Sequence, residues 1–124
     1  MFVLNYKKQF APAVRSGEKR QTIRAQRKDG RLPKVGETLR HYTGMRTSTS
    51  EHLSDSVCKV VVPIHISAYA IGNYAFAIVV GKRHLTFEEG TKLAKADGFG
   101  SRAEFIDFFK EAHGFPFDGF LVKW

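Results

Sequence analysis

The sequence is poor in cysteine, tryptophan and proline, with one, one and four residues respectively among 124, and it contains no apolar run long enough to span a membrane. The single cysteine, Cys58, cannot form an internal disulfide, which excludes a small secreted domain held together by disulfides. Near the N-terminus the lysines follow the apolar residues, an order that is not typical of a signal peptide. We therefore expect a cytoplasmic protein with no membrane partner.

The composition is that of a folded protein. A hydrophobic fraction of 43%, with 11 phenylalanines, argues against disorder. A chain of 124 residues is too short for two cores that are each large enough to fold. The sequence therefore predicts one domain over residues 1–124.

Acidic residues are scarce in the first third of the chain. Residues 1–46 contain 12 lysines and arginines against three acids, whereas residues 47–124 contain eight against nine. The excess behind the formal net charge of +8 thus lies near the N-terminus, and clustered cations of this kind usually face phosphates. An alternative is that residues 27–34, which have the composition of a loop, form a flexible basic segment that binds any anion.

The first candidate site is the segment of residues 16–24 (SGEKRQTIR), which opens with a glycine turn. A strand beginning at Arg20 would place Arg20, Thr22 and Arg24 on one face. Lys19 would stand at the start of this strand, with its amine within reach of the Thr22 hydroxyl. Such a face suits a phosphate, a base or a carbonyl oxygen. The alternative is a solvated edge strand whose charges prevent pairing with other chains.

Hydrophobic alternation and turn residues predict the remaining elements. Strands are expected at residues 2–4, 38–43, 57–70 (one buried strand, or two strands bent at Pro63), 73–80 and 120–124, and helices at 9–15, 86–96 and 101–113. Residues 48–56 have the composition of a loop, and residues 70–72 that of a turn. Within 38–43, Leu39, His41 and Thr43 share one face. The pattern predicts an α+β fold: a small, mostly antiparallel β-barrel with two or three flanking helices.

The last helix carries both a start signal and a buried face. Ser101 and Glu104 have the spacing of a reciprocal capping box. Its apolar positions form one broad stripe that favours a core over a ligand cage: Phe105, Ile106, Phe108 and Phe109. We interpret Trp124 as a plug at one end of the barrel rather than as a stacking platform.

Two further patterns do not predict a site. The five histidines lack the spacing of metal ligands, so no metal and no cofactor is expected. His41 is interpreted as an ordinary half-buried strand residue and is left out of the catalytic set. Gly98 and Gly100 lie near each other, but the lysine of a phosphate-binding loop is missing there, so they indicate a turn between two helices.

Five blocks of sequence together resemble an ASCH domain, and the resemblance spans nearly the whole chain. They are residues 17–24 (GEKRQTIR), 35–39 (VGETL), 42–46 (YTGMR), 97–99 (DGF) and 117–124 (FDGFLVKW). The second-last and last blocks precede and follow the aromatic helix, and the chain is similar to a compact subgroup found in bacteria and their phages. The resemblance implies a PUA-like β-barrel with a cleft beside the glycine-lysine motif. It also implies membership of a superfamily that binds RNA or nucleotides.

Some small members of that family are amidohydrolases that remove acyl groups from the exocyclic nitrogen of cytidine, using a lysine, a threonine and a glutamate. By position, the resemblance assigns these roles to Lys19, Thr22 and Asp97. Asp97 is an aspartate where those enzymes carry glutamate, so its carboxylate reaches one methylene less far.

The chemistry of these residues is coherent for catalysis. Thr22 would attack the amide carbonyl, Lys19 would take its proton, and Asp97 would orient the lysine or bind the cytosine edge. The nearby charges of Arg20 and Arg24 would lower the pKa of Lys19, which a general base requires.

The same region suits plain binding of nucleic acid. Arg20, Arg24 and Arg46 would contact phosphates, and Tyr42 would stack on a base. We rank binding of RNA or a modified nucleotide first, because the charge asymmetry is visible in the residues themselves. An N4-acylcytidine amidohydrolase is the second hypothesis, since one of its three positions has changed. The third is a protein-interaction module using the near-neutral helical part. The sequence predicts no oligomeric state.

Overall fold

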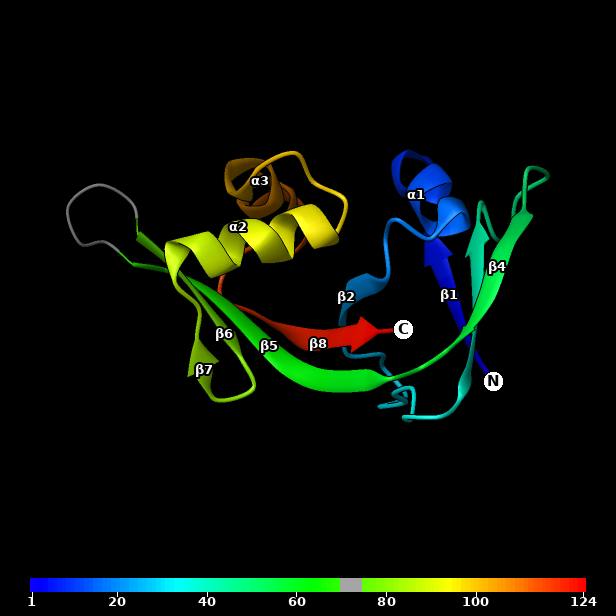
Figure 1. Ribbon diagram of the computed structural model, residues 1–124, viewed down its shortest axis with the longest axis horizontal. Coiled ribbons are helices and arrows are strands. Elements are labelled where there is room, and N and C mark those ends of the chain that lie inside the picture. Colours follow the sequence, from blue (N-terminus) through cyan, green and yellow to red (C-terminus); the bar gives the residue numbers. More distant parts are fainter. Residues whose placement is uncertain (70–74) are drawn as a thin grey trace.

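The computed structural model describes residues 1–69 and 75–124, and these form an α+β fold with three α-helices and mostly antiparallel strands (Figure 1). The fold class predicted from the sequence is therefore confirmed. Strand pairing within these residues gives two sheets, one of three strands and one of five, and no closed barrel. The expected ring of strands is thus replaced by two open sheets.

The smaller sheet has the order β1-β3-β4 and consists of β1 (Phe2–Tyr6), β3 (Thr38–Thr43) and β4 (Glu51–Val57). β1 and β3 run parallel, and β4 is antiparallel to β3. The expected face of β3 is confirmed, because Leu39, His41 and Thr43 are buried. The prediction of a loop over residues 48–56 was wrong, since most of that stretch is strand β4.

The larger sheet is antiparallel throughout and has the order β2-β8-β5-β6-β7. Its strands are β2 (Gln21–Ala25), β5 (Val60–Tyr69), β6 (Ala75–Val80), β7 (Arg83–His84) and β8 (Phe117–Lys123). β5 continues through Pro63, which pairs with Phe120 of β8. The pairing of β6 with β5 matches the prediction, whereas the turn expected at residues 70–72 lies outside the described residues.

The helices lie beside the sheets on one side of the molecule (Figure 1). A short 3-10 turn, η1 (Lys8–Phe10), leads into α1 (Ala11–Ser16), which ends at Gly17 in the left-handed conformation. α2 (Phe87–Ala96) and α3 (Arg102–His113) pack against each other over the larger sheet. α1 lies apart from the α2–α3 pair, and the chain segments between them build the site described below (Figure 1).

The helix starts follow the expected chemistry with one difference. The α2 start is a complete capping box, in which Thr86 and Glu89 each accept from the other's backbone amide. At α3, Ser101 accepts from the Glu104 amide as predicted, but the Glu104 carboxylate accepts from the amide of Gly100 and not from that of Ser101. The Glu104 carboxylate thus bonds the amide one residue before the one predicted.

The core joins the two sheets through aromatic contacts. Phe105, Ile106 and Phe109 are fully buried as predicted, whereas Phe108 is only partly buried. Trp124, immediately after β8, packs on His41 of β3 with ring centroids 4.4 Å apart. The tryptophan therefore bridges the two sheets and does not close the end of a barrel.

Candidate functional site

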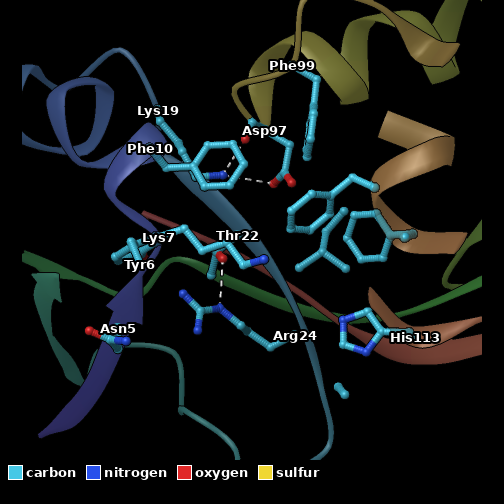
Figure 2. Close-up of a pocket in the computed structure, with 14 residues that line it drawn as sticks. Asn5, Tyr6, Lys7, Phe10, Lys19, Thr22, Arg24, Asp97, Phe99 and His113 are labelled. Atoms are coloured by element: carbon cyan, nitrogen blue, oxygen red, sulfur yellow. Dashed lines mark hydrogen bonds and ion pairs between the residues drawn. The ribbon is translucent and has the colours of Figure 1, made fainter. Parts of the chain in front are cut away.

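A cavity of about 340 Å³ lies where β1, β2, the α2–α3 connection and α3 meet (Figure 2). Its wall consists of Asn5, Tyr6, Lys7, Phe10, Lys19, Thr22, Ile23, Arg24, Ala25, Asp97, Phe99, Phe108, Phe109 and His113. The three residues that the ASCH resemblance assigns to catalysis, Lys19, Thr22 and Asp97, all lie on this wall. Segments from both ends of the chain are thus brought together around one cavity.

A buried ion pair forms one side of the cavity. The Lys19 Nζ atom lies 3.2 Å from Asp97 Oδ1 and donates to the Asp97 backbone oxygen at 2.5 Å. Both residues are almost completely buried, at 3% and 4% exposure. The Gln21 amide donates to Asp97 Oδ1 at 3.3 Å, and the ring of Phe10 lies 5.1 Å from the ammonium. The pair is therefore held by several contacts.

Local backbone geometry places this pair. Gly98 follows Asp97 with φ +100°, a conformation that residues with a Cβ rarely adopt. A Cβ at Gly98 would lie 2.9 Å from Phe10 Cδ1. The predicted turn between two helices is present, and its glycine also lets the Asp97 segment approach Phe10 closely.

Burial shifts the pKa values of both members of the pair toward their neutral forms. It lowers the pKa of Lys19 and raises that of Asp97, and the attraction between the two charges opposes each shift. Repulsion by Arg24, the cause expected from the sequence, is a minor contribution to the lower pKa of Lys19. Perturbed groups in a cavity of this kind are typical of functional sites.

Thr22 and Arg24 form the second polar group of the cavity. The Thr22 hydroxyl, which is buried, accepts from Arg24 Nε at 2.9 Å. The Arg24 guanidinium lies over the ring of Tyr6, 4.8 Å from its centroid. Figure 2 shows this pair beneath the Lys19–Asp97 pair. In the described chain no hydrogen bond joins Lys19 to Thr22, so the expected direct contact between their side chains is replaced by a shared cavity wall.

The prediction that Arg20, Thr22 and Arg24 share one binding face was wrong for Arg20, since only Thr22 and Arg24 line the cavity. Arg20 is exposed and lies outside the cavity wall, whereas Gln21, Thr22 and Ile23 in succession are buried. β2 is an edge strand of its sheet, yet side chains on both of its faces are buried. The segment that contains Asp97 covers one of these faces. Sequence alternation alone did not predict this cover.

Tyr6 is a cavity residue that the sequence analysis missed. Its hydroxyl bonds His41 Nδ1 at 2.9 Å, and His41 Nε2 bonds the Ser56 hydroxyl at 2.6 Å. Burial raises the pKa of Tyr6, and burial lowers the pKa of His41 to about 4, which keeps its imidazole neutral at neutral pH. His41 is thus fully buried, rather than half-buried as expected. The alternation of Phe2, Leu4 and Tyr6 in β1 was the signal that could have placed Tyr6 on an inner face.

The other predicted nucleic-acid contacts are dispersed. Tyr42 lies on β3 outside the cavity wall, with its ring 5.0 Å from that of His52 and the Arg40 guanidinium 5.5 Å from its centroid. Arg46 is exposed and lies on the wall of a second cavity that it shares with Arg24. Of the four residues predicted to contact nucleic acid, only Arg24 therefore lines the first cavity.

The first cavity combines two kinds of surface. Phe10, Phe99 and Phe108 form a cluster of contacting rings, and Lys7 Nζ lies 4.9 Å from the Phe108 centroid. The wall also carries an ammonium, a carboxylate, a hydroxyl and a guanidinium. A flat ligand with apolar faces and a polar edge matches both surfaces.

Within residues 1–69 and 75–124, no cluster of three or more histidine, cysteine or acidic side chains is arranged to hold a metal ion. None of the helices in this part is long and apolar enough to cross a membrane.

No family model, no curated protein and no solved structure matches this chain. The resemblance to ASCH domains accordingly rests on the five sequence blocks alone.

Proposed function

We propose that this protein binds RNA or a modified nucleotide and encloses one base in the cavity of Lys19, Thr22, Arg24 and Asp97. The observation that carries the proposal is the pairing of buried charged groups with aromatic rings around one cavity. Rings stack on the faces of any base, while charged and hydroxyl groups bond its edge.

The size of the cavity supports this ligand class. Its volume of about 340 Å³ lies at the lower end of the range typical of small-molecule sites, roughly 300–1,000 Å³. Asp97 offers a carboxylate oxygen to an N–H donor, and Lys19 and Arg24 offer donors to carbonyl oxygens or ring nitrogens. Both the donor and the acceptor groups on the edge of a pyrimidine or purine would thus have hydrogen-bond partners.

We also propose that the chain is a divergent ASCH domain with a PUA-like fold. The cavity beside the glycine-lysine segment supports this relation, since that is where the family resemblance places the cleft. The two open sheets are the part of the fold that departs from the expected barrel.

Equilibrium binding tests the proposal. The ligands are the four nucleosides, their 5'-monophosphates, N4-acetylcytidine and a short single-stranded RNA. Arg24→Met removes a cavity donor, and Lys82→Met, at an exposed position off the cavity wall, is the control for charge loss. We expect at least one ligand to bind the wild type and the Lys82 variant equally, and the Arg24 variant at least tenfold more weakly, because a hydrogen bond to a charged group contributes roughly 1.5–3 kcal/mol. Equal binding by both variants, or no binding by the wild type, would contradict it.

A second candidate function, deacylation of N4-acylcytidine, is favoured by a specific observation: Lys19, Thr22 and Asp97 line the same cavity, and burial lowers the pKa of Lys19. In this reaction Thr22 Oγ1 attacks the amide carbonyl and passes its proton to neutral Lys19. The C–N bond then breaks, cytidine leaves with that proton, and water hydrolyses the acyl-threonine to a carboxylic acid. The Lys19 amine must first turn from Asp97 toward Thr22, since their hydrogen bond is absent from the described structure.

Hydrolysis of N4-acetylcytidine, followed by chromatography of released cytidine, tests this second function. Lys19→Ala and Thr22→Ala should both abolish turnover, whereas Lys82→Met should retain it. Turnover that persists in the Thr22 variant would exclude threonine as the nucleophile. An inactive wild type that still binds the nucleoside would leave binding as the function.

A further inference from the structure

A second cavity, of about 570 Å³, adjoins the first. Its wall is formed by Val3, Asn5, Arg24, Arg27, Asp29, Met45 and Arg46. Asn5 and Arg24 belong to the walls of both cavities, so a ligand in the first can extend past them into the second. Figure 2 shows the Arg24 guanidinium between Thr22 and Asn5, which is consistent with this position.

The Arg24 guanidinium is held in place by its neighbours and still has N–H groups that can donate to a ligand. Its Nε donates to Thr22, and its planar group lies over the ring of Tyr6. A guanidinium has five N–H donors, and Thr22 takes only the one on Nε, so the terminal nitrogens remain able to donate to a ligand. A guanidinium fixed by its neighbours loses little freedom on binding, which favours a planar two-point contact with an oxyanion.

The turn that carries Arg46 has an unusual backbone. Arg46 has φ 65°, in the left-handed region that residues other than glycine rarely occupy. Neighbouring contacts hold the turn, because the Met45 amide donates to Asn5 Oδ1 at 3.1 Å and the Thr47 amide donates to the Gly44 oxygen at 3.1 Å. The exposed Arg46 side chain is thereby kept at the second cavity although this backbone is costly.

The second cavity has an excess of positive charge. Arg24, Arg27 and Arg46 line it against a single acid, Asp29, which accepts from the Arg31 amide at 2.9 Å. Arg27 is anchored, since it donates to the Val3 oxygen at 2.6 Å and lies 4.0 Å from the Phe2 centroid. Three guanidinium groups around one polar space are the chemistry that recognises a phosphate.

We propose that the second cavity is a phosphate subsite, so that the ligand of this protein is a phosphorylated nucleoside whose base occupies the first cavity. The inference rests on the proposed function, which supplies the base in the first cavity. The phosphate comes either from the end of a free nucleotide or from the backbone of RNA, and both sources present the same oxygens. A free nucleoside is then a poor ligand.

The test uses Arg46→Asn, because asparagine tolerates the left-handed backbone and the substitution removes only the charged side chain. Lys28→Asn is the matched control: it removes one charge from the same basic region, at an exposed residue that lines neither cavity. Affinities of the wild type and both variants are measured for the four nucleosides and their 5'-monophosphates. A second arm uses trinucleotides without terminal phosphates.

We expect the wild type to bind a phosphate-bearing ligand at least roughly tenfold more tightly than the matching nucleoside, since charge-assisted contacts to phosphate are the strong ones. Arg46→Asn should remove most of this preference and leave nucleoside affinity unchanged, whereas Lys28→Asn should alter neither beyond about twofold. Preference for the monophosphate identifies a free nucleotide, and preference for the trinucleotide alone identifies RNA backbone.

Two results would overturn the subsite, and they are distinguishable. If nucleosides and phosphate-bearing ligands bind equally, or if the two variants behave alike, the subsite is wrong while base binding stands. If the wild type binds none of the nucleosides, nucleotides or trinucleotides, the proposed function fails and the subsite fails with it.

Discussion

Replacing Asp97 by alanine should destabilise the protein by about 3–5 kcal/mol, because it leaves the Lys19 ammonium buried without its counter-charge. At 3% exposure the ammonium has almost no access to water. It would keep only the backbone oxygen of residue 97 at 2.5 Å and the ring of Phe10 at 5.1 Å. Neither replaces a carboxylate 3.2 Å away.

The magnitude translates into a measurable change in melting temperature. A domain of this size loses about 3–5 °C per kcal/mol, so Asp97→Ala should lower the Tm by roughly 10–20 °C. The double variant Lys19→Met/Asp97→Ala removes both charges, and its free energy of unfolding should lie within about 2 kcal/mol of the wild-type value. The attraction within a buried ion pair only roughly offsets the cost of removing both charges from water.

Differential scanning calorimetry and urea denaturation of the wild type, Asp97→Ala, Lys19→Met and the double variant complete a double-mutant cycle. The reasoning is refuted if Asp97→Ala costs less than about 1 kcal/mol, or if the double variant is no more stable than Asp97→Ala. Either result would mean that Lys19 reaches solvent, or that the pair is neutral in the folded protein.

The pKa of His41 is lowered from 6.5 to about 4, so neutral His41 contributes stability that is complete above pH 6.5 and is lost as the pH falls toward 4. The loss should reach roughly 3 kcal/mol in urea denaturation across this window, and a pH-independent free energy of unfolding there would contradict it. Tyr6→Phe leaves a buried imidazole nitrogen of His41 without its hydroxyl partner and should cost about 1–3 kcal/mol in the same assay, whereas an unchanged stability would rule that bond out. Gly98→Ala should cost more than Gly81→Ala, because both glycines have positive φ but only at Gly98 would the added Cβ meet Phe10; equal losses would show that the close approach is unimportant.

Elements with a local signal were predicted well from the sequence. The alternation in residues 38–43 gave the correct buried face of β3, and Thr86 and Ser101 mark the two helix starts that the structure shows. β4 was missed because its residues (EHLSDSV) are mainly polar, as is common in an edge strand with an exposed face. Such a strand is specified by its partner β3, and a single-sequence pattern does not contain that partner.

The strand order of the smaller sheet and the burial of β2 depend on contacts between residues that are distant in sequence. The parallel pairing of β1 with β3 joins residues 2–6 to residues 39–43, and no local pattern indicates it. The two-residue period of a strand grouped Thr22 with the cationic Arg20 and Arg24 on one open binding face. The Asp97 segment, more than 70 residues away in sequence, lies over it instead.

The candidate site was predicted in part. The family resemblance brought Lys19, Thr22 and Asp97 together, and the structure places all three on one cavity wall. Arg20 and Tyr42 were chosen for their chemical type, which does not determine where a side chain lies. Tyr6 was missed because the first strand was predicted to cover residues 2–4 only, whereas β1 extends to Tyr6.

The most direct test of base binding is a map of backbone amide chemical shifts in wild-type protein titrated with the nucleotide that binds most tightly. The account predicts that the largest changes fall on Lys19, Thr22, Arg24, Asp97 and Phe99, which surround the first cavity. Changes confined to β4 or to β7, or no changes at saturating ligand, would show that the cavity is not the binding site and would contradict the proposed function.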